Sequence, residues 1–168
     1  MELWDVYTRD RVKTGRVIQR GRQLQPGDYH LVTDIWIMDS RGRLLIQQRS
    51  WAKESAPGLW CCTGGSVIAG EDSLQGMQRE MREELGVPPD LTHSRVVLTS
   101  LGTYSLKDIY LVRQDIPESA LSLQAEEVIA ARWVTFKELQ ALTAQPKVFY
   151  RLAYLPKLLP ILAGEAAV

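Results

Sequence analysis

The segment Asp72–Leu85 constrains the fold of this chain more than any other, because it is the clearest helix in the sequence. It contains no proline, and it is followed by Gly86 and by Pro88-Pro89, which are residues that end helices. Its apolar residues recur at helical spacing and give the helix a single apolar face. We therefore expect this face to pack into a hydrophobic core through Leu74, Met77, Met81 and Leu85.

Strands account for most of the other predicted elements. Apolar and β-branched runs predict strands over residues 3–8, 16–20, 30–38, 43–49, 59–63, 95–103, 108–113 and 128–134. Thr135 and Glu138 form a capping box that predicts a short helix, and Pro146 begins a last helical stretch, broken by Pro156 and Pro160. Strands with a few helices between them indicate a mixed α/β domain. Because the 168 residues contain no Gly/Ser linker, we expect one domain over residues 1–168.

Three glutamates lie on one flank of the predicted helix. At 100° per residue, Glu80, Glu83 and Glu84 cluster beside the apolar face and converge when that face is buried. Carboxylates this close repel one another, and a hard divalent cation such as Mg2+ or Mn2+ relieves the repulsion. A cation held by few protein oxygens keeps positions open for substrate phosphates. Gly64-Gly65 lets a backbone carbonyl approach the same cation, because glycine has no Cβ.

Taken alone, this charged run is more typical of a solvated surface helix than of a metal site. The longer pattern is far more specific. It reads Gly65, five residues, Glu71, seven residues, and then Arg79-Glu80-Met81-Arg82-Glu83-Glu84-Leu85-Gly86-Val87. The chain is identified by this signature as a member of the Nudix hydrolase superfamily. The resemblance implies an α/β fold with a mixed β-sheet sandwiched between α-helices, in which the signature forms a loop–helix–loop motif.

The same resemblance implies an activity and a set of site residues. Nudix hydrolases cleave a diphosphate linked to another group X and use Mg2+ or Mn2+ to do so. Glu83 and Glu84 match the principal metal ligands, and the carbonyl of Gly64 or Gly65 assists them. Glu80 matches a further ligand or the general base that deprotonates the attacking water. Arg79 pairs with Glu71 and orients the glutamates, so both have structural roles.

A second group of candidate residues lies outside the signature. Family members often have a metal-binding or base glutamate before the strand at 128–134, and Glu127 is the candidate here; an ordinary exposed strand start explains it equally well. The chain also resembles type 1 isopentenyl diphosphate isomerases and their hydrolase relatives. The shared segments are Trp4-Asp-Val-Tyr7, His30-Leu-Val, Leu44-Leu-Ile-Gln-Gln-Arg49, Lys53 and Pro57-Gly-Leu-Trp60.

This second resemblance suggests where the substrate binds. Isomerase residues that match Arg49 and Lys53 contact the diphosphate, and here both cations would supply positive charge beside the metal. The alternative is that they are ordinary surface cations at a strand end. Trp60 is a candidate for stacking on a base or lining the pocket.

Several residues conflict with an isomerase activity. The isomerase metal site needs several histidines, but His30 and His93 are the only two in the chain. Gly64-Gly65 stands where the isomerases have His-Pro. Isomerisation also needs Cys61 or Cys62 as an acid in the pocket, whereas free cysteine is more often a buried small hydrophobe. We therefore expect hydrolysis of a nucleoside or other organic diphosphate. An isomerase-like enzyme and a non-catalytic nucleotide-binding regulator are the alternatives.

Charge and cysteine usage restrict the partners and the compartment. The 20 Lys+Arg and 20 Asp+Glu residues balance, without the basic excess typical of proteins that bind nucleic-acid polymers. No apolar run approaches the roughly 18 residues that span a bilayer, and the N-terminus lacks the apolar stretch of a signal peptide. Adjacent cysteines make a poor disulfide. We expect a cytoplasmic enzyme with a small-molecule diphosphate substrate and no nucleic-acid or membrane partner, and a homodimer is left open.

Overall fold

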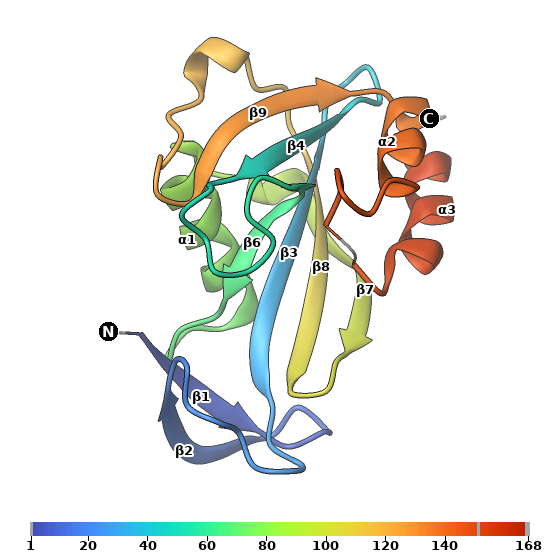
Figure 1. Cartoon of the computed structure of the whole chain (residues 1–168). Helices are drawn as coiled ribbons and strands as arrows, with labels where there is room; N and C mark the ends of the chain where they lie inside the picture. Colours follow the sequence, from blue (N-terminus) through green and yellow to red (C-terminus); the bar gives the residue numbers. More distant parts are fainter. Residues whose placement is uncertain (1, 151, 167–168) are drawn as a thin grey trace.

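The computed structural model describes residues 2–150 and 152–166, and its chain begins with a small separate sheet. Strands β1 (Leu3–Tyr7) and β2 (Lys13–Gln19) pair antiparallel, at the lower end of the molecule in Figure 1. Strand β2 starts three residues earlier than predicted, because its pairing with β1 continues to Lys13 opposite Tyr7. An isolated bridge between Tyr7 and Tyr29 joins this hairpin to the start of the main sheet.

The main sheet is mixed. Its strands run in the order β5 (Trp60–Cys61), β4 (Leu44–Arg49), β3 (His30–Met38), β8 (Ser105–Arg113) and β7 (Ser94–Leu101). Strand β6 (Thr63–Ser66) also pairs with β3, and β9 (Val128–Val134) pairs with β4. The β3–β8 pair is parallel and the other pairs are antiparallel. Strand β3 therefore has β4 and β6 along one edge and β8 along the other, as Figure 1 shows.

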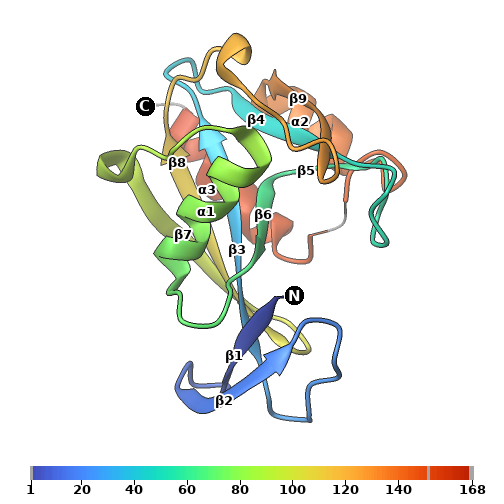
Figure 2. The ribbon, with the colours of Figure 1, turned by 90° about the vertical axis from the view of Figure 1, so that its left-hand side faces the viewer.

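Helices cover both faces of this sheet. Helix α1 (Ser73–Leu85) lies in front of the sheet in Figure 2, and α2 (Phe136–Thr143) and α3 (Leu155–Ala166) lie behind it. Two short 3₁₀ turns, Leu91–His93 and Glu118–Ala120, precede β7 and β9. The predicted fold class, a mixed sheet sandwiched between helices, is confirmed. No helix among the described residues is long and apolar enough to cross a bilayer.

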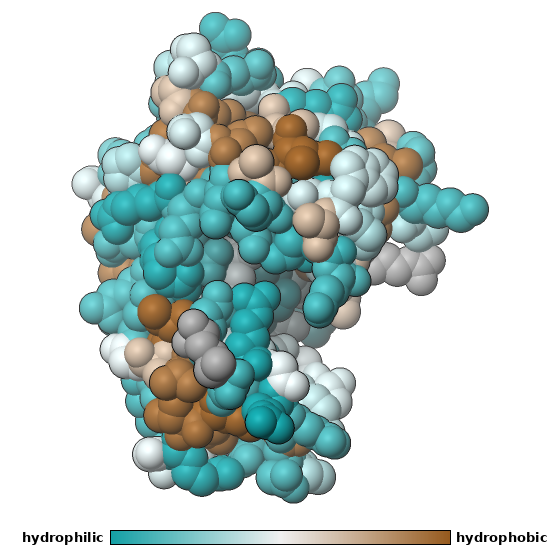
Figure 3. Space-filling model, turned by 60° about the vertical axis from the view of Figure 1, so that its left-hand side comes forward, coloured by the Kyte–Doolittle hydropathy of each residue, from teal (hydrophilic) through white to brown (hydrophobic). Residues whose placement is uncertain are grey.

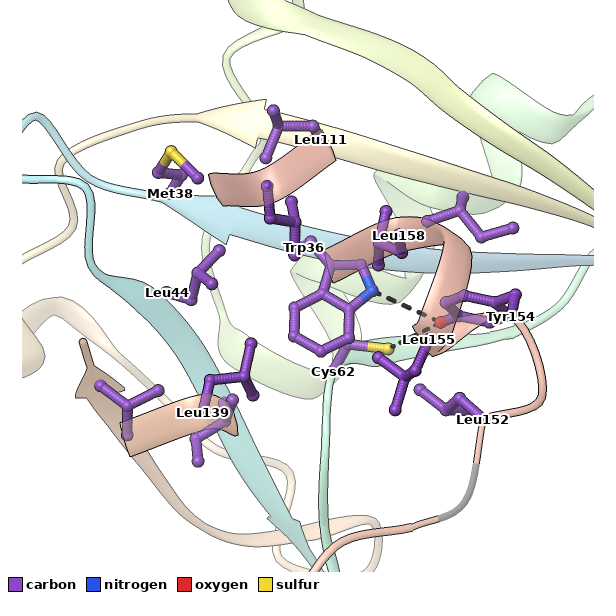
Figure 4. Packing of buried hydrophobic residues seen from close by; sticks show 14 of the residues in the cluster. Trp36, Met38, Leu44, Cys62, Leu111, Leu139, Leu152, Tyr154, Leu155 and Leu158 are labelled. Carbon is purple, nitrogen blue, oxygen red and sulfur yellow. Dashed lines mark hydrogen bonds between the residues drawn. The ribbon is translucent and has the colours of Figure 1, made fainter. Parts of the chain in front are cut away.

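Side chains on the two faces of β3 pack into two different hydrophobic cores. Ile35 and Ile37 pack with α1, whereas Trp36 and Met38 pack with α2 and α3. Figure 4 shows the second core, where Trp36 is surrounded by leucines from several elements. The alternation of side chains along β3 therefore links both layers of helices to one strand.

Helix α1 ends for the reason read in the sequence, and the structure shows why it begins where it does. Asp72 caps its first turn and forms a capping box with Gln75, and Gly86 ends it in the left-handed conformation at φ 73°. Met77, Met81 and Leu85 are fully buried, as predicted. Leu74 is 40% exposed, so its prediction as a core residue is wrong. It lies in the first turn of the helix, outside the contact with the sheet.

The last helix also differs from its prediction. It begins at Leu155 rather than at Pro146, because the chain around Phe149 runs beside β5. Trp60 N donates to Val148 O at 2.8 Å and Tyr150 N donates to Trp60 O at 2.8 Å, so these backbone groups already have partners. Prolines do not break the helix: Pro156 lies in the first turn, where proline is tolerated, and Pro160 lies inside it.

Candidate active site

A polar cavity of about 330 Å3 lies where α1 meets the edge of β6. Figure 3 shows that this side of the molecule is largely hydrophilic, with a hydrophobic patch toward the β1–β2 hairpin. The cavity is lined mainly by charged and glycine residues: Glu2, Arg20, Val32, Asp34, Arg49, Lys53, Gly64, Gly65, Ser66, Arg79, Glu80, Glu83, Glu84, Lys107, Gln124, Glu127 and Tyr150. It thus brings together all of the predicted site residues except Trp60.

Glu84 is the most deeply held of the three helix glutamates. Its side chain is buried, and its Oε2 atom accepts hydrogen bonds from Gln47 Nε2 at 2.8 Å and from Gly64 N at 3.1 Å. Thr63 Oγ1 donates to Gln47 Oε1 at 2.8 Å and so fixes the amide that holds Glu84. Burial raises the pKa of Glu84 to about 8, and the neighbouring charge of Glu80 adds to the shift.

Glu80 lies against the glycine pair, and Glu83 lies toward solvent. Glu80 is buried, and burial raises its pKa to about 7. Its position requires glycine at 65, because a Cβ on Gly65 would lie 2.5 Å from Glu80 Oε1. Gly64 is required for a different reason: its φ is +146°, and a Cβ there would lie 2.2 Å from the backbone oxygen of Thr33. Glu83, by contrast, has a side chain that is 50% exposed.

Arg79 ties the loop before α1 to the glutamates. The predicted ion pair with Glu71 is present, at 3.0 Å between Arg79 Nε and Glu71 Oε1. The same guanidinium donates to Glu80 at 2.8 Å and to Glu83 at 2.9 Å, and its NH2 group donates to the Ser66 carbonyl at 2.8 Å. The planar guanidinium of Arg79, with its five donors, therefore holds together three carboxylates and the carbonyl at the end of β6.

The other predicted residues form the opposite wall, with one exception. Lys53 is paired with Glu127, and both line the cavity. Arg49 lies over the ring of Tyr150, at 5.6 Å from its centroid. Among the described residues Arg49 forms no ion pair: its Nε donates to the Ser55 carbonyl at 2.9 Å, and its side chain lines the cavity. Trp60 does not line this cavity: it packs against the core behind it, with Arg132 4.7 Å above its ring.

Sequence reasoning missed a buried ion pair in the same cavity. Asp34 Oδ2, on β3, accepts from Lys107 Nζ on β8 at 2.8 Å and from Tyr154 OH on the approach to α3 at 2.6 Å. Asp34 is 7% exposed. An aspartate inside the otherwise apolar run His30–Met38 was the signal that could have revealed it, because carboxylates are almost never buried without a partner. The partner itself had no signal, because Lys107 precedes the strand predicted at 108–113.

The donor set fits a hard divalent cation. Within residues 2–150 and 152–166 no three acidic, histidine or cysteine side chains are already arranged as a metal site, since Arg79 binds Glu80 and Glu83. Two buried carboxylates, whose negative charge is opposed by burial, nevertheless lie beside the partly buried backbone of Gly64 and Gly65. Carboxylate and carbonyl oxygens are the ligands that Mg2+ prefers, and a cation there would offset the cost of burying both charges.

Comparison with known proteins identifies the family. The family model described as the NUDIX domain matches residues 28–153. The chain belongs to the Nudix hydrolase family. It is 41% identical over 143 residues to an uncharacterized Nudix hydrolase of Listeria monocytogenes, covering 84% of this chain and 85% of that one. As a member of this family the chain is a pyrophosphohydrolase, and the family generally depends on divalent cations.

Two further matches agree with the resemblances read in the sequence. An isopentenyl-diphosphate Delta-isomerase of Streptomyces avermitilis is 34% identical over 128 residues, covering 68% of this chain and 61% of that one. The crystal structure of a Deinococcus radiodurans protein superposes with a TM-score of 0.77 at 23% identity, covering 95% of this chain and 98% of that one. The relation to the isomerase-like branch is therefore confirmed at the level of sequence, and the Nudix fold at the level of structure.

Proposed function

We propose that this Nudix hydrolase uses Mg2+, or Mn2+, to cleave a nucleoside or other organic diphosphate by attack of water at phosphorus. The observation that carries the proposal is the pair of buried carboxylates, Glu80 and Glu84, held against Gly64 and Gly65 in a cavity that also contains the cation Arg49. Buried acids opposite a guanidinium suit a ligand that combines a divalent cation with phosphate oxygens.

The chain's own residues have distinct roles in this proposal. Gln47 and the Gly64 amide orient Glu84, and Arg79 orients Glu80 and Glu83. Glu80, Glu83 and Glu84 would hold the cation together with the carbonyl of Gly64 or Gly65. Bound Mg2+ supplies positive charge for the diphosphate and lowers the pKa of the attacking water. Glu80 or Glu127 accepts the proton of that water.

The cations on the opposite wall bind the substrate. Arg49 provides planar, bidentate donors for the phosphate oxygens. Lys53 would contact the phosphate oxygens in exchange for its ion pair with Glu127, which would leave Glu127 available as a metal ligand or base. Trp60 stays a prediction as a substrate contact, and its place behind the cavity wall favours a supporting role for it.

The arrangement of the cysteines and histidines favours hydrolysis over isomerisation. Cys61 and Cys62 are both buried and neither lines the cavity. Burial raises the pKa of Cys61 to about 12. His30, the match to an isomerase histidine, is stacked on Trp4 with 4.0 Å between ring centroids and lies outside the cavity lining. The acid and the histidines that isomerisation needs are thus not presented to a substrate.

A turnover screen tests this proposal. The protein is incubated with Mg2+ or Mn2+ and a panel of diphosphates that includes isopentenyl diphosphate, and products are identified by mass. We expect cleavage at the diphosphate and a loss of kcat of at least about 100-fold in Glu84→Gln. Glu118→Gln is the matched control, because Glu118 is exposed in the turn before β9 and does not line the cavity. Isomerised product without cleavage would overturn the proposal, and binding without turnover would indicate the non-catalytic regulator.

Further expectations on compartment, domain organisation, partners and oligomeric state belong with this proposal. We propose the cytoplasm as the compartment and one domain over residues 1–168. The substrate would be a small molecule, with no nucleic-acid polymer or membrane as a partner. A homodimer is left open by the sequence, and its test is the mass of the protein in solution.

A further inference from the structure

The cavity has two chemically different sides, which meet at strand β3. The glutamate side consists of Glu80, Glu83 and Glu84 on α1, beside Gly64 and Gly65 on β6. The lysine side consists of Asp34 on β3 and Lys107 on β8. Because β6 and β8 lie along opposite edges of β3, Lys107 is two strand spacings, about 10 Å, from β6, whereas Asp34 pairs directly with Gly64 and lies between the two. A diphosphate bound on the glutamate side would therefore extend its attached group X toward the lysine side.

The lysine side carries no net charge. Lys107 Nζ lies 2.8 Å from Asp34 Oδ2, and the two side chains are only 22% and 9% exposed. Burial opposes the charge of Lys107, but the adjacent carboxylate outweighs it and raises the pKa of Lys107, so the ammonium keeps its charge beside Asp34. A neutralised pair attracts a phosphate much less than Arg49 does. It offers directional hydrogen bonds instead, from the ammonium and to the carboxylate.

The hydrogen bonds that reach this pair leave capacity for a ligand. Among the described residues, Lys107 and Tyr154 both donate to Oδ2 of Asp34, and Oδ1 accepts no side-chain hydrogen bond. An ammonium has three donors, of which one is used by Asp34. Unused donors of Lys107 and the free Oδ1 thus meet at the cavity wall. Such an adjacent donor and acceptor suit a hydroxyl-bearing group, which both donates and accepts.

Hydrocarbon would be rejected at the same place. An apolar X would remove water from the ammonium and from Oδ1 without replacing its hydrogen bonds. A buried polar group left unpaired costs about 1–3 kcal/mol, and a charged one costs more. A site built to hydrogen-bond a hydroxyl therefore discriminates strongly against an analogue that lacks it.

We propose that the Asp34–Lys107 pair recognises group X, and that X is a hydroxyl-rich group such as a pentose or hexose rather than a hydrocarbon. This inference rests on the proposed hydrolysis of an X-linked diphosphate and names the class of X. Tyr154 acts as a positioning residue, because its hydroxyl holds Asp34 from the α3 side without lining the cavity.

The test compares four probes on the wild-type protein and on Lys107→Met. ADP-ribose carries a pentose, UDP-glucose a hexose, isopentenyl diphosphate a hydrocarbon, and pyrophosphate, used as a competitor, has no X. We expect wild-type kcat/KM for the better sugar probe to exceed that for isopentenyl diphosphate by at least about 100-fold. Lys107→Met should lower kcat/KM for that sugar probe about 10- to 100-fold, mainly through KM, and weaken pyrophosphate inhibition at most several-fold, because it leaves the charge of Asp34 unpaired in the cavity.

Two variants control for folding and for general loss of charge. Lys137→Met removes an exposed lysine from α2 and should leave all four probes unchanged. Asp34→Asn keeps a hydrogen-bond acceptor for Tyr154 but leaves the ammonium without its carboxylate, so it should tighten pyrophosphate inhibition several-fold while weakening the sugar probe. Thermal melting shows whether each variant is folded. If Lys107→Met does not fold, the results with Asp34→Asn decide the test.

Several results would overturn the inference. It is wrong if the wild type prefers isopentenyl diphosphate, or if Lys107→Met weakens the sugar probe, isopentenyl diphosphate and pyrophosphate equally, which would make Lys107 a diphosphate contact. If no probe is cleaved, the proposed function fails instead. Calorimetric binding of ADP-ribose and isopentenyl diphosphate to wild type and Lys107→Met then still tests the recognition of X: a preference for ADP-ribose that Lys107→Met abolishes supports it, and equal binding contradicts it.

Discussion

The two sides of the cavity are assembled from different kinds of sequence information. The glutamate side comes from one continuous segment, in which the loop, the glycine pair and α1 follow one another within residues 64–85. The lysine side joins Asp34 to Lys107, which are 73 positions apart and meet only because β3 and β8 pair in parallel. The first side is therefore dictated by local spacing and the second by topology. We infer that the first side carries the chemistry common to the family and that the second varies with the substrate.

The largest effect is expected from breaking the lysine side. Asp34→Ala leaves Lys107 and the Tyr154 hydroxyl without their shared acceptor, and removing one member of a buried pair is strongly destabilising. We expect the free energy of unfolding to fall by about 3 kcal/mol, near the low end for such pairs because Lys107 borders the cavity water. Urea denaturation measures it.

Two comparisons sharpen this prediction. Replacing both members, as Asp34→Leu with Lys107→Met, should restore most of the lost stability, because no charge is then left unpaired. Glu2→Ala, which breaks the exposed Glu2–Arg20 pair at 2.7 Å, should cost less than about 1 kcal/mol. An Asp34→Ala protein as stable as Glu2→Ala would mean that the lysine side is not a buried pair in solution.

The next effect concerns the glutamate side and its glycines. In Gly65→Ala the new methyl group would overlap Glu80 Oε1, so the carboxylate must move while the strand itself is kept. A displacement of about 1 Å costs about 100-fold in rate, or about 2.7 kcal/mol, and we expect that loss in kcat. Steady-state kinetics and thermal melting separate the site from the fold. Gly164→Ala, where a methyl group meets nothing within 4 Å, is the control. Unchanged kcat in Gly65→Ala would show that the position of Glu80 is not critical.

This difference between the two sides explains which features of the fold and of the site could be predicted from the sequence. The helix, its ends at Asp72 and Gly86 and the Arg79–Glu71 pair depend on neighbours in sequence, and they were predicted from spacing. The Asp34–Lys107 pair depends on strand order, which no local pattern specifies. The same limit explains why the start of the last helix was predicted too early. Proline and apolar residues after 146 predicted a helix, but the backbone around Phe149 forms hydrogen bonds with Trp60 on β5 instead.

His30, four residues before Asp34 on β3, makes the stability of the folded protein sensitive to acid. Its ring is stacked on Trp4, and its Nδ1 atom is buried and has no hydrogen-bond partner among the residues that the structure describes. Burial lowers the pKa of His30 from 6.5 to about 4, and the charges of Lys107 and Arg20 add to this. The unfolded chain therefore binds a proton between pH 6.5 and 4 that the folded protein does not, so stability falls as pH falls through that window.

The size of this loss of stability follows from the pKa shift of His30. At about 1.4 kcal/mol per pKa unit, lowering the pH from 8 to 5 should cost about 2 kcal/mol through His30. Urea denaturation at both pH values measures it. His30→Phe keeps an aromatic stack on Trp4 but cannot be protonated, so its stability should depend less on pH by that amount. His93→Gln is the control, because His93 is exposed beside Asp90. Parallel pH profiles for wild type and His30→Phe would contradict the assignment.

The smallest effect is expected from a conservative change on the glutamate side. Arg79→Lys keeps the positive charge, but one ammonium cannot reproduce the guanidinium contacts to Glu71, Glu80 and the Ser66 carbonyl at once. The glutamates should lose orientation rather than charge balance, so we expect kcat to fall about 10-fold, which is about 1.4 kcal/mol, with little change in KM. Arg82→Lys, one turn along the exposed side of α1, should leave kcat unchanged. If Arg79→Lys raised KM and left kcat intact, Arg79 would contact the substrate, and the glutamate side would be organised by the cation alone.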